Sequence, residues 1–247
     1  MTNLVGRLAK IDLIVFDKDG TLIDFHGMWG GWAVALARGL AADTGRAVEL
    51  PLLGAFGVDA RTGRTRAHGA LAATPMARLQ DLAVEVLRGS GVTEAAAVRA
   101  VAARWSSPDP VAAAQPLADL GRLLDGLAAG VDRGGVRRRL AIATTDDREP
   151  TTRTLDALGL SDRFAAIVCA DDGVRPKPAP DMVHHLCAVL DVGPARTAVI
   201  GDSPSDLRMA RAAGAGLTVG VLSGVGRRSE LAPLADLILP SVAGLLP

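Results

Sequence analysis

Short apolar runs alternate with helical patterns through the second half of the chain, and this alternation restricts the fold more than any other feature. Strands that are covered on both faces have nearly continuous apolar sequences. Runs of that kind separated by helices predict an α/β fold with a parallel, Rossmann-like sheet and helices on both faces. The candidate strands are Ile11–Phe16, Leu140–Ala143, Ala166–Ala170, Thr197–Ile200, Leu217–Leu222 and Asp236–Leu239.

The first two candidate strands are separated by on the order of 100 residues, far more than one crossover helix needs. An inserted subdomain explains this interval best. Helical spacing of apolar residues predicts helices over Met28–Ala42, after Thr74 and after Thr93, with Thr93 as a side-chain cap. We therefore predict an α/β core domain of residues 1–24 and 116–247 and an inserted, mainly α-helical subdomain of residues 25–115.

Composition excludes several classes of protein. Lys plus Arg and Asp plus Glu number 27 each, so net charge favours neither nucleic acid nor an anionic membrane as a partner. Aromatic residues make up 3% and tyrosine is absent, which disfavours an RNA surface built on stacking. The two cysteines, Cys169 and Cys187, are too few for a disulfide framework. Without a run long enough to span a membrane, the chain is expected to be cytoplasmic, as a monomer or a homodimer.

Two aspartates follow the first candidate strand, in Asp17-Lys18-Asp19-Gly20-Thr21. In an open parallel sheet, ligands bind at the carboxyl ends of the strands, so both side chains should face the crevice. A carboxylate can attack phosphorus and form an acyl phosphate that water later hydrolyses. The second carboxyl can protonate the leaving oxygen and then activate that water. We assign Asp17 as the nucleophile and Asp19 as the acid/base.

Three later strand ends carry polar residues suited to the same chemistry. Thr144 ends the second candidate strand and offers a hydroxyl to a phosphoryl oxygen. Lys177 is one of three lysines in the chain and lies in a proline-rich loop, where it can neutralise phosphoryl oxygens. Asp202 and Asp206 follow the fourth candidate strand. Mg²⁺ prefers oxygen ligands, so Asp17, Asp202 and the backbone carbonyl of Asp19 are the candidate metal site, with Asp206 orienting Lys177 or a metal-bound water.

This ordered set of motifs resembles the haloacid dehalogenase superfamily, and within it most closely the phosphoglycolate phosphatases. The resemblance covers about residues 10–25 and 116–247, and it also includes Leu155–Phe164 and Arg211–Gly214. It implies a Rossmann-like core, a helical cap inserted between the first two motifs, Mg²⁺ and an aspartyl-phosphate intermediate. It also implies the roles assigned above for Asp17, Asp19, Thr144, Lys177 and Asp202. The expected substrate is a small phosphorylated metabolite.

Two positions depart from the pattern of those relatives. Lys18 stands where phosphoglycolate phosphatases more often have an apolar residue, and Thr145-Asp146 stands where relatives often have asparagine after the threonine.

Asp19 favours a phosphatase over a dehalogenase, because an alkyl halide needs no protonated leaving group. A cap lysine typical of phosphonatases is absent from residues 25–115. A phosphomutase of the β-phosphoglucomutase type and a non-catalytic phospho-ligand binder remain as alternatives.

Substrate choice is expected to lie in the cap, which would exclude water and contact the leaving group. His26 and Trp29 are candidates for that contact, although hinge and core packing explains Trp29 equally well. Arg61, Arg64 and Arg66 offer a site for a second anionic group, and a solvated basic turn is the preferred interpretation.

Overall fold

The structure is a computed structural model that describes residues 6–74, 76–106, 108–109, 111–129 and 137–245. The chain divides into two compact units. The core unit comprises Met1–Asp24 and Ala114–Pro247, and the inserted unit comprises Phe25–Ala113.

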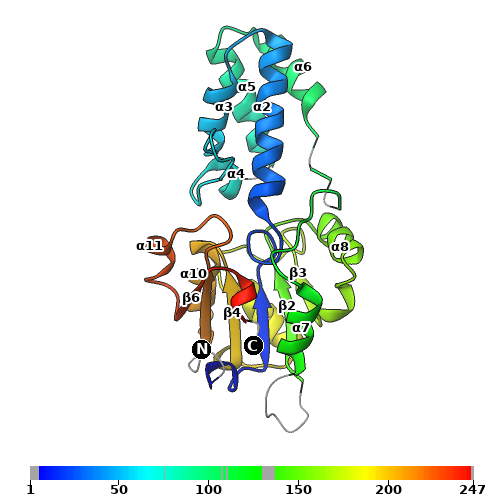
Figure 1. The fold of residues 1–247 in the computed structure, drawn as a ribbon, viewed down its shortest axis with the longest axis vertical. Helices are drawn as coiled ribbons and strands as arrows, with labels where there is room; N and C mark the ends of the chain where they lie inside the picture. The colour runs from blue at the N-terminus through cyan, green and yellow to red at the C-terminus, as the bar shows by residue number, and fades with distance from the viewer. Residues whose placement is uncertain (1–5, 75, 107, 110, 130–136, 246–247) are drawn as a thin grey trace. The chain divides into compact units, whose positions relative to one another are not determined.

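Within the described residues, six parallel strands form one sheet, as the apolar runs predict (Figure 1). The strand order is β3-β2-β1-β4-β5-β6, so β1 lies in the middle, between β2 and β4. Four strands are shorter than the predicted runs, whereas β2 begins one residue earlier and β4 ends one residue later than predicted. Their bounds are β1 Leu13–Phe16, β2 Arg139–Ala143, β3 Ala166–Val168, β4 Thr197–Gly201, β5 Leu217–Val221 and β6 Leu237–Leu239.

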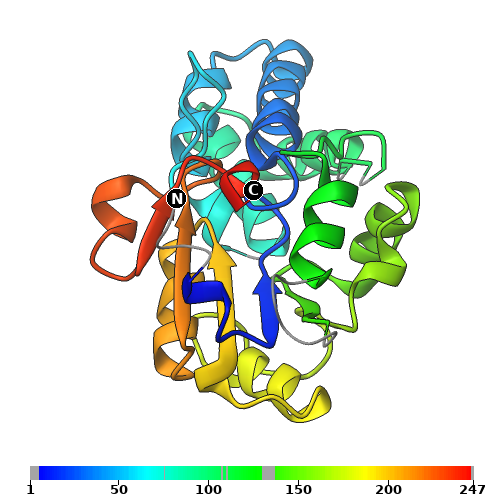
Figure 2. The same ribbon diagram turned by 60° about the horizontal axis from the view of Figure 1, so that its bottom comes forward.

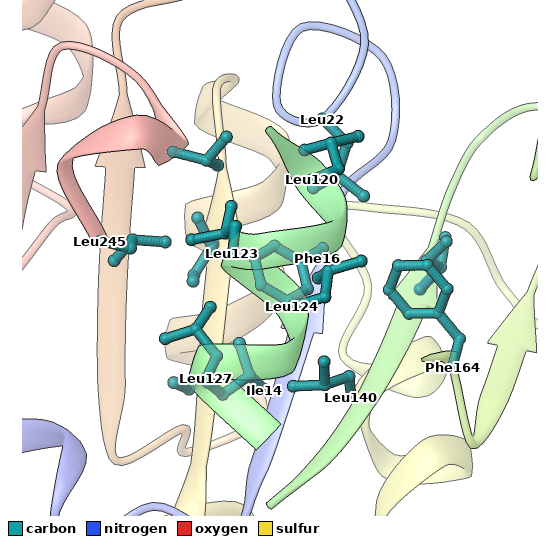
Figure 3. Close-up of a cluster of buried hydrophobic side chains, with 14 of the residues drawn as sticks. Ile14, Phe16, Leu22, Leu120, Leu123, Leu124, Leu127, Leu140, Phe164 and Leu245 are labelled. Carbon is teal, nitrogen blue, oxygen red and sulfur yellow. The ribbon is translucent and has the colours of Figure 1, made fainter. Parts of the chain in front are cut away.

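Each central strand is buried on both faces, because successive side chains point to opposite sides. Along β1, Ile14 and Phe16 join one hydrophobic cluster, whereas Leu13 and Val15 join another. Figure 3 shows the first of these clusters, with the leucines of helix α7 (Leu120–Ala129) packed on β1. The second cluster is completed by helices α9 (Asp181–Val189) and α10 (Pro204–Ala212). Both cysteines are buried and free.

The helices of the core unit lie on both faces of this sheet (Figures 1 and 2). Helix α8 begins at Arg148, so Pro150 lies inside its first turn rather than at its head, and Gly159, with φ of 65°, follows its end. Proline is tolerated there because the first-turn amides have no partner within the helix. The bounds are α7 Leu120–Ala129, α8 Arg148–Ala157, η2 Ser161–Arg163, α9 Asp181–Val189, η3 Pro194–Arg196, α10 Pro204–Ala212, α11 Arg228–Leu231 and η4 Val242–Leu245.

The inserted unit is helical and has a hydrophobic core of its own. Its elements are a π-helix η1 His26–Gly30 and helices α2 Gly31–Thr44, α3 Glu49–Phe56, α4 Ala70–Ala73, α5 Met76–Gly89 and α6 Glu94–Arg104. Arg104 donates two hydrogen bonds to Asp43, of 2.6 and 2.7 Å, and so ties α6 to the end of α2.

Three details of the inserted unit differ from the sequence-based expectation. The first helix has a π-helical turn before α2, rather than a single α-helix from Met28 to Ala42. Thr93 occupies the N-cap position of α6, but its side chain makes no capping hydrogen bond. Helix α3 is not among the predicted helices, and it contains Pro51 in its first turn, where proline is allowed.

Among the described residues, no helix combines the length and apolar character that crossing a bilayer requires.

Candidate active site

Asp17 and Asp19 lie directly after the central strand β1, where the chain makes a sharp turn. The amide of Asp17 still donates to the carbonyl of Ile200 on β4, at 2.9 Å, so the nucleophile candidate is fixed by the sheet itself. Gly20 then adopts a φ of 89°. An ideal Cβ on Gly20 would lie 2.6 Å from Asp202 Oδ2, so only glycine lets the turn pass this close to Asp202.

Lys177 reaches this strand end from the loop before α9. Its Nζ lies 2.5 Å from Asp17 Oδ1 and 2.5 Å from Asp206 Oδ1, and its side chain is only 3% exposed. Burial alone would lower the pKa of Lys177, but the two carboxylates outweigh burial and raise it above its usual value. The lysine is therefore a fixed positive charge beside Asp17.

Asp202 follows β4 and is held by hydrogen bonds on both oxygens. Thr21 Oγ1 donates to its Oδ1 at 3.2 Å, and the amide of Val225 donates to its Oδ2 at 2.8 Å. The loop after β5 that supplies Val225 also contacts the first turn, since Ser223 Oγ donates to the carbonyl of Gly20 at 2.7 Å. An ideal Cβ on Gly224 would lie 1.9 Å from Asp202 Oδ2.

Asp206 lies in the first turn of α10, and both of its oxygens are occupied. Its Oδ1 accepts from Lys177, and its Oδ2 accepts from the amide and hydroxyl of Ser203 at 3.0 and 2.6 Å. Ser203 and Asp206 thus form a reciprocal capping box, which fixes the start of the helix. This arrangement suits a residue that orients Lys177.

Carboxylate oxygens of Asp17, Asp202 and Asp206 lie within 4.8 Å of one another. Burial raises the pKa of Asp17 to about 6, against the lowering effect of Lys177, and Asp206 raises it further. Burial also raises the pKa of Asp202 well above its usual range, with Asp17 as the next cause. These are hard oxygen donors in a cluster with more negative than positive groups, so the residues fit a magnesium ion.

Asp19 and Thr144 belong to a second polar network at the end of the neighbouring strand β2. Lys18 Nζ lies 2.8 Å from Asp19 Oδ2 and 2.9 Å from Asp146 Oδ2. The amide of Asp146 donates to Thr144 Oγ1 at 3.1 Å, which leaves the hydroxyl proton of Thr144 to donate elsewhere. Burial raises the pKa of Asp19, against the opposing effect of Lys18. Thr145, which follows Thr144 in the chain, is exposed.

The six candidate residues therefore fall into two groups. Hydrogen bonds join Asp17, Lys177 and Asp206, with Asp202 beside them, whereas Asp19 and Thr144 are linked through side chains that the motifs do not assign. Sequence reasoning missed the roles of Thr21, Asp146 and the loop 223–226. The role of Asp146 could be predicted only if the burial of Lys18 were known, because a buried ammonium requires acidic partners. The sequence does not show that burial.

The candidates in the inserted unit have structural contacts of their own. His26 Nδ1 accepts from the amide of Thr65 at 3.2 Å. Trp29 packs against Phe25 and Trp32, with ring centroids 6.4 and 5.9 Å apart. The three arginines of the turn after α3 are exposed, which agrees with a solvated basic turn: Arg61, Arg64 and Arg66.

Comparison with known proteins supplies the family. The model for haloacid dehalogenase-like hydrolases matches residues 11–214. The chain belongs to this hydrolase family. A phosphoglycolate phosphatase of Rhodospirillum rubrum is 31% identical over 209 residues, which cover 83% of this chain and 78% of that protein. A plasmid-encoded one of Cupriavidus necator is 37% identical over 98 residues, or 38% of this chain and 42% of that protein. The chain is thus a phosphatase-type hydrolase of the family.

Solved structures support the same fold. A structure from Haemophilus somnus named as a predicted phosphoglycolate phosphatase has a TM-score of 0.65 at 20% identity, covering 96% of this chain and 97% of that one. A structure from Thermotoga maritima named for β-phosphoglucomutase also has a TM-score of 0.65, at 16% identity, covering 96% of this chain and 97% of that one. Both names occur on one fold, so the fold does not separate phosphatase from mutase.

Proposed function

We propose that this hydrolase is a magnesium-dependent phosphatase that cleaves a small phosphate monoester through an aspartyl-phosphate on Asp17. The observation that carries the proposal is the contact between Asp17 and the buried Lys177, beside the carboxylate of Asp202. A buried lysine touching a candidate nucleophile stabilises the negative charge of a transferring phosphoryl group. Phosphoglycolate belongs in the substrate set because relatives are named for it, and the inserted unit is proposed to act as the cap.

The first half of the reaction forms a bond from an Asp17 oxygen to phosphorus as the bond from phosphorus to the leaving oxygen breaks. Asp19 gives its proton to that leaving oxygen, so the product departs as a neutral alcohol. Lys177 and the hydroxyl of Thr144 hold the phosphoryl oxygens while charge builds on them.

In the second half, Asp19, now ionised, takes a proton from a water molecule that attacks the same phosphorus. The bond from Asp17 to phosphorus breaks, inorganic phosphate leaves, and both carboxyl groups return to their starting states. Asp17, Asp202 and the backbone carbonyl of Asp19 would hold Mg²⁺, which neutralises phosphoryl charge when bound. We further expect the enzyme to work in the cytoplasm, where buried thiols such as Cys169 stay reduced.

The direct test is hydrolysis of p-nitrophenyl phosphate with and without Mg²⁺. The wild type should turn over only with the metal, and Asp17→Asn should lose at least about 10³-fold in kcat while keeping the circular dichroism spectrum of the wild type. Asp81→Asn is the control, because the side chain of Asp81 is 67% exposed on α5 of the inserted unit. Full metal-dependent activity in Asp17→Asn would refute the assignment.

A screen of phosphorylated metabolites then separates the candidate activities. A phosphatase releases inorganic phosphate from monoesters without any added cofactor sugar. A mutase instead requires a bisphosphorylated sugar and returns an isomer, so release of phosphate without that sugar argues against it. A binder would show affinity without turnover, and turnover abolished by a chelator would exclude it.

A further inference from the structure

Lys18, between the two reacting aspartates, is among the most completely buried side chains of the protein. It is 1% exposed, although it carries an ammonium group. Removing an ammonium from water costs several kcal/mol unless ion pairs and hydrogen bonds compensate for it. The family resemblance and the proposed mechanism give this residue no task, so its burial requires a separate explanation.

The ammonium of Lys18 has acidic partners on two sides. Its Nζ lies 2.8 Å from Asp19 Oδ2 and donates a hydrogen bond to Asp19 Oδ1 at 3.0 Å, so it contacts both oxygens of this carboxyl group. The remaining contact is with Asp146 Oδ2, at 2.9 Å. An ammonium has three donors, and these three oxygens match them in number.

Asp146 is itself fixed to the loop after β2. Its Oδ1 accepts from the amide of Asp147 at 3.0 Å, and its own amide donates to Thr144 Oγ1 at 3.1 Å. Its carbonyl accepts from the amide of Ala170 at 3.0 Å. Side chain and backbone are thus both tied to the end of the sheet, so Asp146 can set where the ammonium of Lys18 lies.

We propose that Lys18 and Asp146 form a positioning pair that sets the orientation of the Asp19 carboxyl group for proton transfer to the leaving oxygen. Asp19 directly precedes Gly20 in the turn after β1 and keeps 14% side-chain exposure, so without the pair its carboxyl group is free to rotate toward solvent. Lys18 acts through Asp19, and Asp146 acts through Lys18. This inference rests on the proposed function, because it gives Asp19 the acid/base role.

A purely structural role for the pair predicts a different pattern of rates. Proton donation matters most when the leaving oxygen is a strong base, and hardly at all when it leaves readily as an anion. Misorienting Asp19 should therefore slow the cleavage of alkyl phosphates far more than that of nitrophenyl phosphates. Loosening the fold should slow all substrates alike. The comparison uses kcat/KM, which reports the step in which the leaving group departs.

The main variant is Asp146→Asn, which keeps the shape of the side chain and does not alter Asp19 or Lys18. For glycerol phosphate we expect kcat/KM to fall by roughly 100-fold, the scale of a misplaced catalytic group, with dinitrophenyl phosphate reduced less than about threefold. Lys18→Met should give the same pattern, and Lys18→Met combined with Asp146→Asn should lose little more than either alone. Lys10→Met, at an exposed lysine, is the matched control and should leave both rates unchanged.

The double variant also guards against misfolding, because Lys18→Met alone leaves the partly buried carboxylates of Asp19 and Asp146 without their shared ammonium. The combined variant removes one of those two negative charges. Equal losses on both substrates, or no loss in Asp146→Asn, would overturn the positioning role while leaving the proposed function intact. Full activity of Asp17→Asn, or a wild type without phosphatase activity, would overturn both. The positioning role would be supported if kcat/KM of Asp146→Asn depends more steeply on the leaving group than that of the wild type, and if Asp19→Asn shows the same dependence. Adding Lys18→Met to Asp19→Asn should then cause no further loss.

Discussion

The close approach of Gly224 to Asp202 allows the metal site to be perturbed without removing any functional group. Gly224 is not among the glycines with positive φ, so its backbone accepts alanine and the only effect is steric. The added methyl group would lie 1.9 Å from Asp202 Oδ2 and 2.3 Å from its Cγ. The variant Gly224→Ala therefore displaces one carboxylate in an otherwise complete site.

The size of the effect follows from these distances. Ordinary contact begins at 3.4 Å, so the carboxylate must move by about 1.5 Å, more than the 1 Å misplacement that can cost ~100-fold in rate. The move also stretches the 2.8 Å hydrogen bond from the amide of Val225. We expect kcat/KM for p-nitrophenyl phosphate to fall by at least about 100-fold. The Mg²⁺ concentration that gives half-maximal activity should rise in the same variant.

The assay is a magnesium titration of activity, together with a thermal melt that reports folding. The matched control is Gly126→Ala on the exposed surface of α7, where an added Cβ meets nothing within 4 Å. That control should leave the kinetics unchanged and stabilise the core by up to ~1 kcal/mol, because alanine is the better helix former. Wild-type rates and magnesium dependence in Gly224→Ala would show that Asp202 does not act from the position described.

Three further predictions concern metal binding, the pH dependence of stability and a buried arginine. Mg²⁺ needs the ionised form of Asp17, whose pKa is raised to about 6, so the apparent Kd measured by titration calorimetry should rise as pH falls below 6, by up to about tenfold per pH unit for one proton. In the metal-free protein, the folded state binds the proton on Asp17 more tightly than the unfolded state does. The free energy of unfolding of the metal-free protein should therefore fall as pH rises from about 4 to about 6. Arg138 is 7% exposed and donates to the carbonyls of Ile11, Leu127 and Leu8 at 3.1, 3.0 and 2.9 Å. Arg138→Met should therefore destabilise the core by about 3 kcal/mol in a denaturant titration, with kcat/KM unchanged below the melting range.

The sheet was predictable because its central strands are buried on both faces. Such strands produce apolar runs of four or five residues, too short for a typical helix, and the order of motifs then locates the carboxyl ends. Helix α3 was harder to predict, because a proline usually indicates a break in a helix. Pro51 is tolerated only because it falls in the first turn of α3. The π-helical turn at His26–Gly30 has no sequence signal that we recognise.

The candidate site was predictable in its parts rather than in its connections. Asp17, Lys177 and Asp202 follow from residue type and position at strand ends, because a parallel sheet gathers these ends at one edge. The partners of those residues depend on side-chain directions in loops that have no periodic pattern. Lys18 illustrates the limit: its charge suggests an exposed residue, and only its burial reveals the need for Asp146.

Charge balance predicts the order in which the metal ion and the substrate bind to this site. Two buried lysines serve two pairs of carboxyl groups, Lys177 with Asp17 and Asp206, and Lys18 with Asp19 and Asp146. Asp202 lies beside Asp17, and none of the lysine ion pairs at this site within the described residues includes it. A phosphate dianion brought next to such a cluster meets net repulsion, unless the carboxyl groups are protonated, and a protonated Asp17 is a poor nucleophile. A divalent cation removes both obstacles, since it ionises Asp17 and attracts the phosphoryl group. We therefore expect Mg²⁺ to bind before the substrate, and phosphate analogues to bind measurably more weakly to the metal-free protein at pH 7.5 than to the magnesium-loaded one.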